Sequence, residues 1–87
     1  MGAHRDLPAN YARFFRALGA RIRSYRVENG FTQEDMIFLG FSLRHWQKIE
    51  AGRPINVVTV LRICEAFGVT FEELFDGLSR YLRKQRR

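Results

Sequence analysis

Apolar residues recur at helical spacing along the first third of the chain and predict one long amphipathic helix. The apolar stripe consists of Tyr11, Phe14, Phe15, Leu18, Ile22 and Tyr25. At about 100° per residue these positions fall on one face of a helix, and several arginines share the neighbouring face. Pro8 suits the first turn of a helix, and Asn29-Gly30 suits its end. We therefore expect one helix over residues 9–28, with Gly19 tolerated in its interior at a cost of about 1 kcal/mol.

Two short helices, over residues 33–39 and 43–51, are predicted next along the chain. Their N-caps are Thr32 and Ser42, and the glycines that end them are Gly40 and Gly52. In the second helix Trp46 and Ile49 share one face, and hydrogen-bonding side chains occupy the others. An N-capped helix with an outward row of polar side chains, braced across a tight turn, is typical of a helix-turn-helix reader of DNA. We refer to residues 43–51 as the reading helix.

The last third of the chain predicts two further helices. Asn56 is a plausible cap for a broad apolar helix over residues 57–67. Thr70 and Glu73 form a capping box in the sequence, and the apolar positions after it hold one face as far as residue 84. We therefore expect a continuous amphipathic helix over residues 71–84, in spite of Gly77. With no strand pattern and no boundary, residues 1–87 are expected to form one all-α domain with an N-terminal arm at 1–7 and a C-terminal helix extension at 77–87.

Several motifs resemble the lambda-repressor-like helix-turn-helix family, also called the xenobiotic-response-element type. They are Thr-Gln-Glu-Asp-Met at 32–36, Gly-Phe-Ser at 40–42 and Ile-Glu-Ala-Gly at 49–52, with flanking matches at 18–23 and 60–69. The resemblance covers about residues 18–76, and the spacing from Thr32 to Ser42 is one residue shorter than in the family. It implies a compact five-helix DNA-binding domain, here with extended first and last helices. It also implies a structural role for Glu50, paired with an arginine such as Arg26 or Arg62.

The net charge of +6 is unevenly distributed. Residues 1–31 carry +4 and residues 53–87 carry +3, whereas residues 32–52, which include the reading helix, carry −1. The flanks therefore supply the positive field that would attract phosphates. Ordinary solubility is the alternative explanation of this charge.

Four residues of the reading helix are candidates for contacts with DNA bases. They are Leu43, Arg44, Gln47 and Lys48. Arginine can grip guanine O6 and N7 with two hydrogen bonds, glutamine can read adenine, and leucine can meet a thymine methyl group. Alternatively, Arg44 is a solvated surface arginine without a contact, and Leu43 is a hydrophobic residue that flanks the turn.

Seven further residues are candidates for contacts with phosphates. They are Arg16, Arg23, Gln33, Ser42, His45, Arg53 and Asn56. The resemblance implies this role for Gln33 and Ser42, because helix N-termini direct N–H groups toward phosphates. The arginines and Asn56 flank the reading helix, and a lone exposed His45 can equally have no role.

Nothing in the sequence points to catalysis, a metal or a cofactor. His4, His45 and Cys64 show no ligand spacing, and Cys64 lies on an apolar helical face. One cysteine excludes an intramolecular disulfide and suits a reducing cytosol, and no apolar run approaches the roughly 20 residues of a membrane span. We expect a cytoplasmic, non-enzymatic protein with no small-molecule ligand.

Apolar residues beyond those a minimal domain buries point to a second chain. We expect a homodimer closed by Leu78, Tyr81 and Leu82 of the last helix. Such a dimer would read two half-sites of a palindromic operator and regulate transcription, most simply as a repressor. Two alternatives stay open. The protein could be an antitoxin that binds both DNA and a toxin, or it could be a protein-interaction domain that does not bind DNA. A protein partner, either a toxin or an anti-repressor, is also possible.

Overall fold

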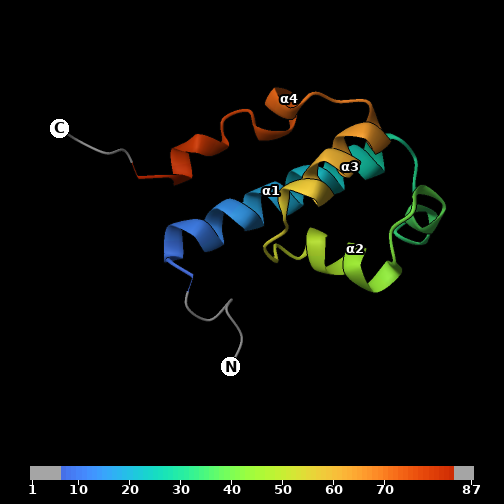
Figure 1. Ribbon diagram of the computed structural model, residues 1–87, viewed down its shortest axis with the longest axis horizontal. Helices are drawn as coiled ribbons and strands as arrows, with labels where there is room; N and C mark the ends of the chain where they lie inside the picture. The colour runs from blue at the N-terminus through green and yellow to red at the C-terminus, as the bar shows by residue number, and fades with distance from the viewer. Residues whose placement is uncertain (1–6, 84–87) are drawn as a thin grey trace.

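The structure is a computed structural model that describes residues 7–83, and this part of the chain contains helices and no strand. In chain order the helices are α1 (Ala9–Glu28), η2 (Glu34–Leu39), α2 (Leu43–Glu50), α3 (Val57–Phe67), α4 (Phe71–Phe75) and η3 (Leu78–Tyr81), where η denotes a 3-10 helix (Figure 1). The all-α prediction is confirmed, and α1 has the predicted bounds. Apart from Leu7, the predicted N-terminal arm lies outside the described residues, as do residues 84–87.

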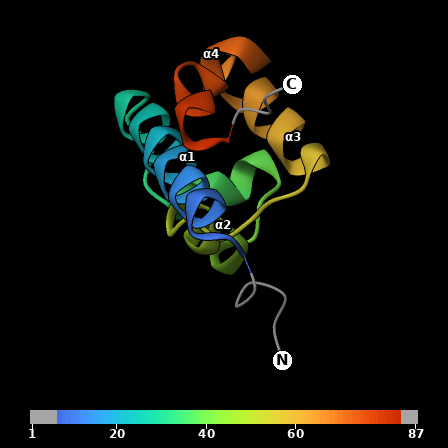
Figure 2. The same cartoon turned by 90° about the vertical axis from the view of Figure 1, so that its left-hand side faces the viewer.

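The long helix α1 contacts each of α2, α3, α4 and η3. Seen along α1, α3 lies on the opposite side of the molecule, with α4 above and α2 below (Figure 2). Trp46 of α2 is fully buried among these helices. Its ring meets Phe41 edge-on at 4.9 Å and Phe67 at 6.1 Å between centroids. Such aromatic pairs stabilise a core beyond the area that they bury, so the reading helix is fixed to the centre of the domain.

The first helix of the motif, predicted over residues 33–39, is present as η2, which is a 3-10 helix of six residues. A 3-10 helix has about 3.0 residues per turn against about 3.6 in an α-helix, so six residues complete two turns where an α-helix needs about seven. η2 therefore completes two turns within the short segment between Thr32 and Ser42. Thr32 and Asp35 exchange hydrogen bonds at the start, and Gly40 ends η2 with a φ of 91°.

The C-terminal segment does not form the continuous helix that was expected. α4 ends at Phe75, and Gly77 takes a left-handed φ of 76° before η3 begins. Arg21 of α1 donates hydrogen bonds to the carbonyl oxygens of Leu74 and Asp76, which caps the short helix. After the turn at Gly77, Leu78 is buried in the core. The expectation of an extended last helix was therefore wrong.

The turn at Gly77 also determines where the three predicted dimer contacts, Leu78, Tyr81 and Leu82, lie. Leu78 is 1% exposed and belongs to the core of its own chain, so its assignment to a dimer interface was wrong. Tyr81 is half-buried against that core, and its carbonyl oxygen accepts a hydrogen bond of 3.1 Å from Asn10 of α1. Of the three predicted residues, Leu82 alone is exposed.

Candidate nucleic-acid interface

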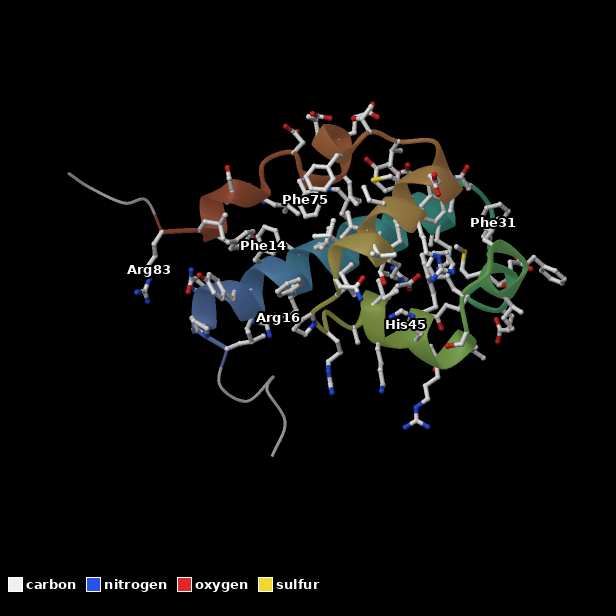
Figure 3. All side chains as sticks on the ribbon, in the orientation of Figure 1. Phe14, Arg16, Phe31, His45, Phe75 and Arg83 are labelled. Atoms are coloured by element: carbon white, nitrogen blue, oxygen red, sulfur yellow. The ribbon has the colours of Figure 1, made fainter. Side chains whose placement is uncertain are left out.

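The reading helix α2 lies at one edge of the molecule and exposes a polar ridge. Its buried face consists of Trp46 and Ile49. Arg44, Gln47 and Lys48 are exposed on the other side, and Figure 3 shows long nitrogen-tipped side chains that extend from α2 away from the rest of the molecule. Ridges of this kind fit the major groove of duplex DNA.

The first turn of α2 and its N-cap form the beginning of the ridge. Leu43 and His45, in the first turn of α2, are half-buried. Ser42 caps the helix, because its hydroxyl oxygen accepts a hydrogen bond of 3.1 Å from the backbone N–H of His45. The cap satisfies one of the free N–H groups at the helix start and fixes the direction in which α2 leaves the turn.

A buried carboxylate holds the other end of α2. Glu50 accepts hydrogen bonds from four donors: Arg26 Nε and Nη2, Gln33 Nε2 and Trp46 Nε1. The Arg26 and Glu50 side chains are only 10% and 4% exposed, and Arg26 Nη1 also donates to the carbonyl oxygen of Phe31 at 2.8 Å. These contacts join α1, the approach to η2 and the reading helix at one point.

The network favours the ionised form of Glu50. Burial raises the pKa of this carboxyl group, but the hydrogen bonds from Arg26, Gln33 and Trp46 outweigh burial and hold the pKa below its ordinary value. The hydrogen bond to Glu50 raises the pKa of Arg26 against the opposing effect of burial. The expected pairing of Glu50 is thus found with Arg26. The other candidate, Arg62, instead donates to the carbonyl oxygen of Gly40 and lies 4.4 Å from the centre of the Phe41 ring.

Two glycines allow α1 and the end of α2 to approach closely. A Cβ atom at Gly19 would lie 2.6 Å from the carbonyl oxygen of Ile49, so only glycine fits there. A Cβ atom at Gly52 would lie 2.9 Å from the Cα of Arg16, and Gly52 has a φ of 93°. The ending glycine was predicted from the sequence, but the role of Gly19 as a packing site was missed. One usable signal was its position among the apolar residues of α1.

The seven predicted phosphate contacts separate into four groups, of which Gln33 alone forms the last. Arg16, Arg23 and Arg53 are exposed, and the close approach at Gly52 places Arg16 beside the end of α2. Ser42 and the N-cap Asn56 are exposed with one oxygen engaged in capping, which leaves their hydroxyl or amide donors available. His45 is half-buried.

Gln33 differs from the other six. Its side chain turns inward, and its amide nitrogen donates a hydrogen bond of 3.0 Å to Glu50. The structure therefore gives Gln33 a role in holding the reading helix, which the sequence did not indicate. A phosphate contact by this residue stays a prediction.

The remaining chemistry-bearing residue, Cys64, is buried on the inner face of α3. Burial, followed by the nearby Glu65 and Glu72 carboxylates, raises the pKa of its thiol, which favours the protonated and unreactive form. Among the described residues no helix is long and apolar enough to cross a bilayer.

An N-capped helix with an exposed polar ridge, packed against two preceding helices, defines a helix-turn-helix domain of the DNA-binding class. The helix-turn-helix domain family matches residues 17–76, and the chain belongs to this family. Neither a curated protein nor a solved structure is significantly similar to the chain.

Proposed function

We propose that this protein binds double-stranded DNA sequence-specifically as a homodimer and represses transcription at a palindromic operator. The observation that carries the proposal is the exposed ridge of Arg44, Gln47 and Lys48 on a helix whose opposite face is buried. A ridge that is rigid and uncovered can enter a major groove without rearrangement of the domain.

Each exposed residue has a chemically defined role in this proposal. Arg44, in the first turn of α2, grips a guanine through O6 and N7, and Lys48, one turn later, reaches a second guanine or a phosphate. Gln47 reads adenine, and the half-buried Leu43 contacts a thymine methyl group. Phosphate contacts from Arg16, Arg23, Ser42 and Asn56 set the position of the domain on the duplex and carry no sequence information.

Repression follows from occupancy. In a two-fold dimer the two reading helices enter successive major grooves about 34 Å apart, and the bound dimer excludes RNA polymerase from the same DNA. Because regulation then depends on the bound fraction, protein concentration and partner proteins set the level of expression.

Selection of bound sites from random DNA, followed by titration of single-residue variants, tests the proposal. Arg44→Ala should cost about 1–3 kcal/mol on the selected site and relax the preference at one base pair. Arg80→Ala, at an exposed position on η3, removes the same charge and should affect selected and random DNA little and alike. Arg16→Ala should weaken both kinds of DNA equally, since a phosphate contact does not depend on sequence.

Two results would overturn the proposed function. One is the absence of any selected sequence, with weak binding that disappears in moderate salt, as expected of charge attraction alone. The other is an equal loss for Arg44→Ala on selected and random DNA, which would remove Arg44 from base readout.

A further inference from the structure

Helix α3 is apolar on two faces, and residues 7–83, which the structure describes, cover only one of them. The inner face contains Val60, Ile63 and Cys64, each at most 9% exposed. The outer face contains Val57, Val58 and Leu61, which are 63%, 65% and 50% exposed. A helix that is apolar all round is normally buried all round, so an outer aliphatic stripe of this kind indicates a covering partner.

The charges that flank this stripe are opposite in sign. Arg53 precedes the start of α3 and Glu65 lies one helical turn after Leu61, and both side chains are exposed. In a two-fold contact the same patch meets itself with its direction reversed. Two copies of α3 packed antiparallel therefore bring Glu65 of one copy toward Arg53 of the other, at both ends of a shared aliphatic stripe. Two copies of a chain with a net charge of +6 repel each other, but on this surface opposite charges meet.

The other exposed apolar groups do not suit a two-fold contact in this way. On η2 Ile37, Phe38 and Leu39 are exposed beside Glu34, and residues 32–43 contain two acidic residues and no basic one. Self-contact there would place carboxylates against carboxylates. At the C-terminal end Leu82 lines an apolar hollow with Tyr11, Phe14 and Phe15. The charged side chains beside this hollow are Arg13, Arg16 and Arg83, so self-contact there would place arginines against arginines.

We infer that the outer face of α3, built from Val57, Val58 and Leu61 and bordered by Arg53 and Glu65, is the surface on which a second copy of this chain docks. The inference rests on the homodimer of the proposed function and specifies its interface. α3 follows the reading helix after only residues 51–56. A two-fold axis beside α3 therefore holds two reading helices near each other, as binding to adjacent half-sites requires.

Sedimentation of the full chain without DNA, combined with glutamate substitutions at single exposed apolar positions, tests the interface. The native protein should sediment at twice the 10.3 kDa of one chain. Leu61→Glu and Val58→Glu should each sediment as monomers at concentrations that keep the native protein dimeric. The matched controls are Val27→Glu on α1, where the aliphatic side chain is 52% exposed, Phe38→Glu on η2 and Leu82→Glu. These three should remain dimeric, and circular dichroism should show native helix content in all five variants.

A charge exchange tests the antiparallel arrangement separately. Glu65→Arg should weaken the dimer at least tenfold, because arginines then face each other at both ends of the stripe. The double variant Arg53→Glu/Glu65→Arg should restore dimerisation. No recovery in the double variant would overturn the antiparallel arrangement.

The failure of this inference differs from failure of the proposed function. Monomers from Leu82→Glu or Phe38→Glu, with an intact Leu61→Glu dimer, would overturn the α3 interface and leave DNA binding untouched. A native protein that is monomeric but selects a DNA sequence would overturn it equally. A dimer broken by Leu61→Glu that selects no sequence would support the interface and reject the proposed function.

Discussion

The buried pair of Arg26 and Glu50 offers the sharpest test of how the reading helix is held. Glu50→Leu would leave the guanidinium of Arg26, only 10% exposed, without its carboxylate. Breaking a buried ion pair from one side costs about 3–5 kcal/mol, and the indole N–H of Trp46 and the amide of Gln33 also lose their acceptor. We expect a loss of about 4 kcal/mol, which in a domain of this size lowers the melting temperature by about 20 °C.

The double variant Arg26→Met/Glu50→Leu should recover much of this loss. It removes the unpaired charge and fills the same space with apolar atoms, and such replacements of whole ion pairs are often neutral or stabilising. Two donors, on Trp46 and Gln33, would still lack an acceptor, so a residual cost of about 1–3 kcal/mol is expected. The double variant should therefore be more stable than Glu50→Leu alone.

Urea unfolding at neutral pH, followed by circular dichroism, measures the free energies of unfolding of the native protein, of Glu50→Leu and of the double variant. Glu28→Leu, at an exposed position of α1, serves as the control for replacing a surface carboxylate and should change stability by no more than about 0.5 kcal/mol. A double variant as unstable as Glu50→Leu would refute the reasoning. The cost would then arise from lost packing and hydrogen bonds and not from an unpaired buried charge.

Two further outcomes follow from the same junction of α1 and α2. Because the pKa of Glu50 is lowered on folding, its ionised form contributes stability above the ordinary glutamate pKa of about 4.3, and this contribution is lost as the pH falls through the folded pKa. Urea unfolding between pH 3 and 7 should show that the native protein is more stable than Arg26→Met/Glu50→Leu except at the acidic end. A difference in stability that stays constant with pH would contradict this. Gly19→Ala should destabilise the domain by about 1–3 kcal/mol in spite of the better helix propensity of alanine, because the new Cβ meets backbone oxygens at 2.6 and 2.9 Å. Helix propensity alone predicts a higher melting temperature. That result would show that α1 and α2 can move apart at little cost.

The helix boundaries that depend on local chemistry were predictable from the sequence. The apolar stripe and the terminal Asn29-Gly30 gave the bounds of α1. Ser42 and Asn56 cap α2 and α3 through their side-chain oxygens, and Thr70 and Glu73 form the capping box that the sequence indicated. In these cases the donor and acceptor lie within three residues of each other, so the sequence contains the whole interaction.

The features that depend on tertiary contact were not predictable. The shortened spacing between Thr32 and Ser42 was visible in the sequence, but the 3-10 geometry of the helix between them was not. The apolar periodicity through Leu78 suited a continuous helix, but the chain turns at Gly77, and η3 then packs against α1 with Leu78 buried. The inward direction of Gln33 and the contact of Gly19 with Ile49 depend on where α2 packs, which no local pattern encodes.

The junction at Glu50 separates the stability of the fold from the choice of DNA target, two properties that single substitutions usually change together. All four hydrogen bonds to this carboxylate come from residues that lie off the exposed ridge. Residues 44, 47 and 48 can therefore be exchanged, in natural relatives or in designed libraries, with little effect on whether the domain folds. A library randomised at these three positions should yield many well-folded proteins with new target preferences, whereas one randomised at positions 26, 46 and 50 should yield mostly insoluble ones.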